Sequence, residues 1–110
     1  MSWFENGRGS ELLTVDEMYR ADAAAMAGGI VYVALQALEL EPFTEVIVPP
    51  ITDPGGMMPV PLLNLIPVVA DAAPDSFNSS AEQIKARLTD RTTAIVVAHI
   101  SGIPAEIDRI

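Results

Sequence analysis

The chain has 110 residues, of which half are hydrophobic, and a formal net charge of −9 with only six basic residues. This length suits one small domain, and the composition is that of a globular protein. So few Lys and Arg residues argue against nucleic acid and anionic membrane as partners, because phosphate contacts need clustered positive charge. With no cysteine, disulfides, thiolate metal sites and thiol nucleophiles are also excluded, and no metal site is predicted.

The N-terminal part predicts a polar leader followed by a capped helix. Thr14 and Glu17 form a capping box, and the Ala-rich segment after them predicts a helix through Met26. Gly28 and Gly29 are expected to end that helix. Their N–H groups could also hold a phosphate before the next helix, although a plain cap is the commoner role. The sequence has no secretory signal and no apolar run long enough to span a bilayer, so we expect a cytoplasmic protein without a membrane partner.

The rest of the chain predicts alternating strands and helices. Residues 30–38 (IVYVALQAL) are apolar nearly all round, which favours a buried helix, although a strand is the alternative. Short β-branched runs without polar alternation predict strands covered on both faces. The expected strands are 46–48, 67–70 and 94–98, with helices near 55–65, from a capping box of Ser79 and Glu82, and at 105–110. This order predicts an α/β fold with a mainly parallel sheet and right-handed crossovers.

Ligands of open α/β sheets bind beyond the carboxyl ends of the strands, which singles out three loops. These are PPITDPGG after the first strand, DAAPDSFN after the second and HISGIP after the third. Pro49 and Pro50 should stop the ladder of the first strand, since proline has no N–H to donate. The segment from Asp53 to Gly56 predicts a plain turn on spacing alone.

Two residues are chemical candidates because each is the only one of its type. His99 follows the third strand, where it could stack on a cofactor, act as a base, or be a satisfied structural histidine; the sequence favours neither kind of role. Lys85 lies on the polar face of a predicted amphipathic helix, an unsuitable place for a Schiff-base amine. No catalytic residue is therefore assigned.

Three stretches then reveal a family resemblance. VALQALELEPFTEVIVPPIT, IPVVADAAPDSFN and AEQIKARLTDRTTAIVVAHISGIPAEID occur in one order over about three quarters of the chain. They resemble the large domain of the DegT/DnrJ/StrS sugar aminotransferases, pyridoxal-phosphate enzymes of the aspartate-aminotransferase fold (fold type I). The resemblance implies a three-layer, partial large domain over residues 30–110, preceded by the leader and capped helix at 1–29.

The resemblance also implies an activity and a cofactor site. Members of this family transfer an amino group from an amino donor to a keto-sugar nucleotide, for polysaccharide or antibiotic sugar synthesis. Their phosphate-binding turn falls on Met26, Ala27 and Gly28, and of these Ala27 and Gly28 could donate backbone N–H groups. The aromatic residue that stacks on the pyridine ring falls at Asp53, and His99 fits the family loop. The family's Schiff-base lysine and its pyridine-pairing aspartate correspond to positions beyond the end of this sequence.

We therefore expect a piece of a pyridoxal-phosphate aminotransferase that is inactive by itself and forms homo-oligomers or associates through uncovered apolar faces. A non-catalytic interaction module is the alternative from another class, and a monodisperse particle would favour it. A further alternative comes from residues 11–30, which resemble the opening helix of the NAD(P)H-hydrate epimerases. That alternative predicts binding of a nicotinamide nucleotide.

Overall fold

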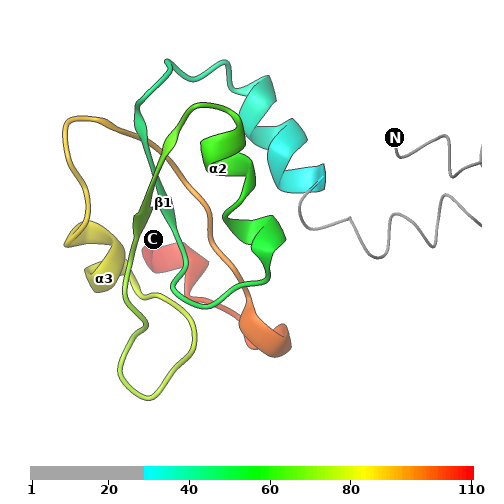
Figure 1. The fold of residues 1–110 in the computed structure, drawn as a ribbon. Helices are drawn as coiled ribbons and strands as arrows, with labels where there is room; N and C mark the ends of the chain where they lie inside the picture. Colours follow the sequence, from blue (N-terminus) through cyan, green and yellow to red (C-terminus); the bar gives the residue numbers. More distant parts are fainter. Residues whose placement is uncertain (1–28) are drawn as a thin grey trace, which may run out of the picture.

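The computed structural model describes residues 29–110, which form a parallel sheet of three strands in the order β2-β1-β3 (Figure 1). The predicted helix ending at Met26, together with Ala27 and Gly28, lies outside the described residues. The strands are β1 (Glu45–Val48), β2 (Ile66–Val69) and β3 (Thr92–Ile95). The helical elements are a helix at residues 29–37, η1 (Pro54–Gly56), α2 (Pro59–Leu62), α3 (Ala81–Lys85), η2 (Ile100–Gly102) and η3 (Ile107–Arg109).

The sheet has helices on both of its faces, as a three-layer α/β fold requires. On one face Val46 and Val48 of β1 pack with Leu35 of the helix at 29–37 and Val60 of α2. On the other face Ile47 of β1 packs with Ala70 and with Ile84 of α3. Figure 1 shows α3 on one side of the sheet and α2 with the helix at 29–37 on the other. The predicted three-layer, parallel α/β architecture is confirmed.

Two prolines after β1 end its hydrogen-bond ladders with both neighbouring strands. On the β3 side the last ladder bond runs from the Val96 N–H to the Ile47 carbonyl, and on the β2 side from the Ala70 N–H to the Val48 carbonyl. In a parallel ladder the next donors would be the N–H groups of residues 49 and 50. Both positions are proline, so neither bond can form. The sheet therefore opens after Val48, as the sequence predicted.

The third strand was predicted two residues too late. It spans Thr92–Ile95, not 94–98, and the register between β1 and β3 shifts between Glu45 and Val46, with Thr93 as the extra residue. The side chain of Thr93 bonds the Glu45 carbonyl (3.3 Å) and lies 3.0 Å from the Thr44 hydroxyl, which accommodates the bulge. The apolar run continues to residue 98, but the ladder stops because Pro49 has no donor for the Val96 carbonyl.

Burial differs most from the sequence expectation in the helix at 29–37. The segment is a helix, so the strand alternative is wrong, and Gly29 belongs to this helix. The predicted end of the preceding helix at Gly28 lies outside the described residues. Of its apolar side chains Leu35 is buried, whereas Ile30 and Val33 are 59% and 65% exposed. The prediction of a fully buried helix is wrong, because the sheet covers only one stripe of it. Likewise β2 and β3 are only partly covered, unlike β1.

The remaining helices are shorter than the sequence predicted. The segment near 55–65 contains η1 and α2, and Pro59 occupies a first-turn position, where its missing N–H costs little. The helix expected over 105–110 is the single turn η3. In this part of the chain, residues 29–110, no helix is long and apolar enough to cross a membrane.

Ser80, and not Ser79, caps α3. The Ser80 hydroxyl accepts a hydrogen bond from the Gln83 N–H at 3.5 Å, whereas the buried Ser79 Oγ has no hydrogen-bond partner. The N-cap of this helix therefore lies one residue later than predicted. Because the helix ends at Lys85, Leu88 falls outside it and is 51% exposed.

An ion pair joins α3 to the C-terminal turn η3. Arg109 Nη2 lies 2.8 Å from Glu82 Oε1, and Arg109 Nη1 lies 2.7 Å from Glu106 Oε2. The backbone N–H of Glu82, the Ser80 hydroxyl and then Arg109 hold the pKa of Glu82 below its ordinary value. These groups are exposed, so the pair contributes little to the free energy of unfolding.

The two serines allow a direct test of the cap. Ser80→Ala should lower the free energy of unfolding by about 0.5 to 1 kcal/mol, because the Gln83 N–H loses its acceptor. Ser79→Ala should leave that free energy unchanged or raise it by up to about 1 kcal/mol, because it removes a buried hydroxyl without a partner. Urea denaturation of both variants measures the difference. A larger loss for Ser79→Ala than for Ser80→Ala would contradict this assignment.

Candidate functional site

A cleft opens at the carboxyl edge of the sheet, between the chain segments that leave β1 and β3. Its volume is about 480 Å³, a size typical of small-molecule sites. We call it the strand-end cleft. It is lined by Ile30 and Val31 from the helix at 29–37, by Ile51, Thr52, Asp53 and Gly56 after β1, and by residues 96–101 after β3.

The cleft exists because β1 and β3 are neighbours whose exit segments diverge. After Pro50 the chain turns through η1 and α2 toward β2, on the far side of β1 from β3. Such a crevice at the strand ends is where open α/β sheets bind ligands. Of the three loops predicted to form the site, those after β1 and β3 line the cleft, whereas no residue of DAAPDSFN does.

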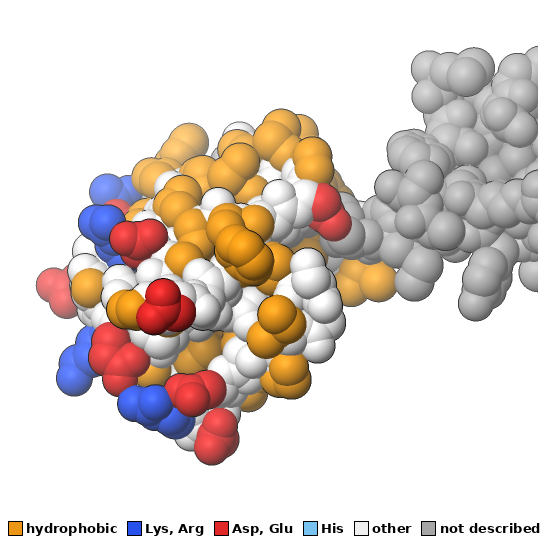
Figure 2. All heavy atoms as spheres, turned by 90° about the horizontal axis from the view of Figure 1, so that it is seen from below, with side chains coloured by type: hydrophobic (Ala, Val, Ile, Leu, Met, Phe, Trp, Pro, Cys, Tyr) orange, Lys and Arg blue, Asp and Glu red, His pale blue; other side chains and the backbone are white. Residues whose placement is uncertain are grey.

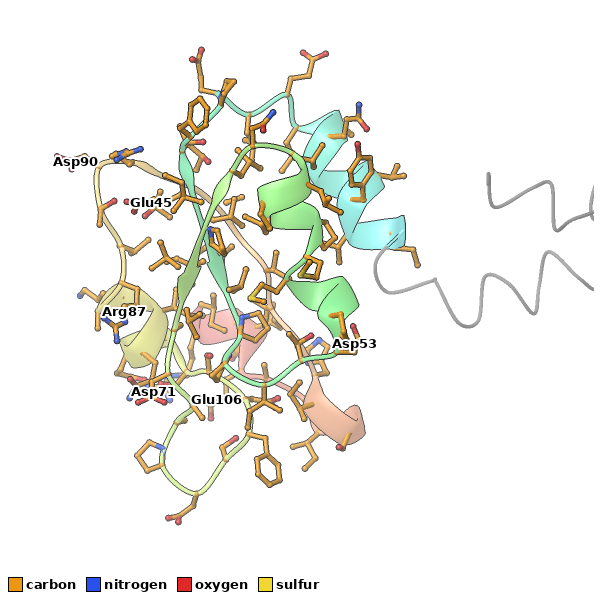
Figure 3. The ribbon with its side chains drawn as sticks, viewed as in Figure 1. Glu45, Asp53, Asp71, Arg87, Asp90 and Glu106 are labelled. Carbon is orange, nitrogen blue, oxygen red and sulfur yellow. The ribbon has the colours of Figure 1, made fainter. Side chains whose placement is uncertain are left out.

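The first wall is a compact turn held by Asp53. The Asp53 carboxylate accepts a hydrogen bond from the Gly56 N–H at 3.2 Å and caps the turn η1 (Figure 3). Gly56 is buried, and a Cβ placed on it would stand 2.0 Å from Thr52 Oγ1. The plain turn predicted here is thus a capped 3-10 turn in which glycine is required by close approach.

The second wall is the loop from His99 to Ala105. His99 Nδ1 accepts the Ala105 N–H at 2.9 Å, so in this arrangement the neutral ring carries its proton on Nε2. The loop also contains consecutive residues with positive φ, Ser101 (54°) and Gly102 (75°). His99 is an exposed, hydrogen-bonded member of the cleft wall. Its basic nitrogen is occupied, which favours a contact role over that of a general base.

Sequence reasoning did not single out Asn78, which connects two of the loops at the carboxyl edge of the sheet. It is 7% exposed, its Nδ2 donates to the Ile103 carbonyl at 2.8 Å, and its Oδ1 accepts from the Ile100 N–H at 2.9 Å. Asn78 thereby connects the loop after β2 to the loop after β3. The family-like stretch IPVVADAAPDSFN ends on this residue. No spacing rule, however, distinguishes a buried loop asparagine from an exposed one.

The cleft is lined mainly by apolar side chains and contains one carboxylate, that of Asp53. Its described lining residues include Asp53 but neither Lys nor Arg, and Lys85 belongs to α3 on the opposite face of the sheet. Figure 2, which views the molecule from below Figure 1, shows charged side chains gathered at one side and a mainly uncharged, hydrophobic surface elsewhere. Among residues 29–110 no group of three or more His, Asp or Glu could hold a metal ion.

The described residues fit pyridoxal phosphate only in part. The volume and apolar lining suit a flat aromatic ring, but a carboxylate stands where the resemblance places a stacking aromatic, and the described lining residues include no Lys or Arg that could pair with a phosphate. The phosphate donors predicted at Ala27 and Gly28 lie outside the described residues.

Comparisons with known proteins identify the fold as that of aminotransferases. An aminotransferase from Psychrobacter cryohalolentis is 36% identical, with a TM-score of 0.72. DesV of S. venezuelae, in complex with a ketimine intermediate, is 28% identical with a TM-score of 0.72, and a proposed sugar aminotransferase of Streptococcus pneumoniae, in its PMP form, is 28% identical with a TM-score of 0.70. Each match covers 76% of this chain but only 21% or 22% of the other chain.

The fold of the described residues is therefore that of one part of the fold type I aminotransferases. The sequence profile of the DegT/DnrJ/EryC1/StrS aminotransferase family matches residues 21–110. The chain belongs to this family. It spans about one fifth of the length of the solved structures that it resembles.

Close packing at Gly56 gives a test of the first wall. Gly56→Ala should lower the free energy of unfolding by about 1 to 3 kcal/mol, because the new methyl group overlaps Thr52. Gly29→Ala is the matched control: nothing lies within 4 Å of its Cβ position, and the residue is helical. That control should be neutral or stabilising by up to about 1 kcal/mol. Equal effects of the two substitutions in urea denaturation would contradict the packing at Gly56.

Proposed function

We propose that this chain is a segment of a pyridoxal-phosphate-dependent sugar aminotransferase and supplies one wall of its cofactor site. The observation that carries the proposal is the strand-end cleft, at the ligand-binding edge of a fold shared with sugar aminotransferases. The proposed substrates of the whole enzyme are an amino donor and a keto-sugar nucleotide. The proposed division of the chain is residues 1–29 as leader and capped helix and 30–110 as the aminotransferase-like part.

Within that site we assign contact roles to residues of this chain and no catalytic role. Ala27 and Gly28 are proposed to donate backbone N–H groups to the phosphate. The His99 ring is proposed to face the cofactor ring from the β3 side, which its place in the cleft wall supports. Pyridoxal phosphate, when bound, supplies the electron sink for amino transfer.

We further propose that the isolated chain does not catalyse transamination. Its only lysine, Lys85, is exposed on α3 and lies on the face of the sheet that is opposite the helix at 29–37. A Schiff-base lysine needs an amine that is desolvated or otherwise activated beside the cofactor. Lys85 meets neither condition.

A chimera tests the proposal directly. The aligned residues of this chain would replace the matching segment of the Streptococcus pneumoniae sugar aminotransferase, which has been solved in a PLP form. The chimera should show the absorbance of a bound pyridoxal phosphate, whereas the isolated chain should show no borohydride-reducible adduct. Asp53→Phe in the chimera should tighten cofactor binding about threefold to tenfold, since ring stacking replaces a carboxylate.

The controls separate the possible causes. Asp90→Phe introduces the same ring at the opposite end of the sheet, as Figure 3 shows, and should leave cofactor binding unchanged. A chimera that folds but does not bind the cofactor would overturn the proposed function. A reducible adduct on the isolated chain that disappears with Lys85→Ala would overturn the proposed inactivity.

The sheet edges support self-association as a second part of the proposal. Val69 of β2 and Ile95 of β3 lie on edge strands and are 47% and 38% exposed. Exposed edge strands with apolar side chains are surfaces on which proteins associate. We propose that copies of the chain associate through the β3 edge, where α3 leaves Ile95 uncovered.

Light scattering after size exclusion measures this association. The wild-type chain should elute as a dimer or larger particle, and Ile95→Lys should shift it toward the monomer by placing charge on the edge. Leu88→Lys is the matched control: the side chain is 51% exposed in the segment after α3, and its replacement should leave the particle size unchanged. A monodisperse wild-type monomer would contradict self-association and favour a self-contained interaction module.

A further inference from the structure

Asn78 makes hydrogen bonds from both its backbone and its side chain, and together they immobilise it. Its N–H donates to Ser76 Oγ at 3.0 Å, and its carbonyl accepts from the Ala73 N–H at 2.9 Å. The side chain then reaches the neighbouring loop through the Ile100 N–H and the Ile103 carbonyl. In a buried amide whose nitrogen and oxygen are both hydrogen-bonded, the nitrogen must donate and the oxygen must accept. This pairing fixes the orientation of the side chain, and a carboxylate could not replace it, since it has no N–H to donate.

The loop that Asn78 holds contains an unfavourable backbone conformation. Ser101 has φ 54° and ψ 29°, a region that costs a non-glycine residue free energy, and Gly102 follows with φ 75°. Such residues persist when the surrounding structure over-determines them. The two bonds from Asn78 attach on either side of this pair, at Ile100 and Ile103, and so fix both ends of the strained turn.

The same loop carries His99 at the cleft wall. The Gly102 N–H bonds the His99 carbonyl at 3.1 Å, and the Ala105 N–H bonds His99 Nδ1 at 2.9 Å. The ring orientation and tautomer of His99 therefore depend on where residues 102 and 105 lie. Those positions depend in turn on the bonds made by Asn78 at Ile100 and Ile103.

We propose that Asn78 is the positioning residue of the strand-end cleft: it fixes the loop of residues 99–105 so that the His99 ring faces the cleft in its Nε2–H form. Asn78 does not line the cleft and acts only through this loop. The role assigned to His99 at a cofactor rests on the proposed function, whereas the coupling of Asn78 to the His99 ring is a property of the isolated chain.

The test uses the ring of His99, which is the only histidine and so gives an unambiguous signal. Nitrogen-15 spectra of the full chain should show the Nε2–H tautomer as the dominant neutral form. Asn78→Asp retains an acceptor for the Ile100 N–H, but its carboxylate repels the Ile103 carbonyl. The loop should then loosen, and the His99 ring should become a mixture of its two neutral tautomers. Asn64→Asp makes the same chemical change at an exposed loop position and should leave the ring unchanged.

Hydrogen exchange of the wild-type chain provides a measurement that does not depend on how a variant folds. The Ile100 N–H should exchange about tenfold to a hundredfold more slowly than an unprotected amide, because Asn78 Oδ1 holds it. An unprotected Ile100 amide in a folded wild-type chain would overturn the proposal. A folded Asn78→Asp variant that keeps the wild-type tautomer would overturn it equally.

Binding of pyridoxal phosphate distinguishes this proposal from the proposed function. In the chimera described above, Asn78→Asp should weaken cofactor binding about tenfold if His99 faces the cofactor. If the chimera does not bind the cofactor but the His99 ring of the isolated chain responds to Asn78→Asp, the positioning role stands and the proposed function fails.

Discussion

The structure depends on the complete burial of β1 between its two neighbours. Val46, Ile47 and Val48 are at most 1% exposed, and they supply apolar side chains to the cores on both faces of the sheet. A strand that is covered on both faces must also pair on both edges, because its polar backbone has no access to water. Both neighbouring strands and the helices on each face are therefore arranged around these residues.

The same strand determines where the cleft lies. Since Pro49 and Pro50 supply no donors, the ladders on both sides end within one residue of each other, and the chain segments beyond them separate. The gap is then shaped by the capped turn at Asp53 and by the loop from His99 to Ala105, each closed by its own hydrogen bonds. The two prolines that end the sheet therefore also create the cleft at its carboxyl edge.

The chain belongs to an aminotransferase family, but its strand-end cleft has a carboxylate, Asp53, where the resemblance places a stacking aromatic residue. Asp53 is used to cap its own turn, and the cleft has an apolar lining without a described cation. The family relationship comes from ordered stretches spread over most of the chain, whereas the chemistry depends on single side chains. The fold can therefore be shared while individual contact residues differ.

Local composition and periodicity were enough to predict the order of the elements, the parallel sheet, the buried central strand and the prolines that end it. The family was predicted from the resemblance of three ordered stretches, and the family profile over residues 21–110 confirms it. Three predictions were wrong: β3 was expected two residues too late, Ser79 was expected to cap α3, and the helix at 29–37 was expected to be buried. The first and third of those errors concern partners distant in sequence, namely the register of β3 against β1 and the extent of the sheet beneath the helix. The error at Ser79 is local, because the cap contact joins residues three positions apart. The link from Asn78 to the His99 loop was likewise decided only by tertiary structure, since it joins residues more than 20 positions apart through a buried amide.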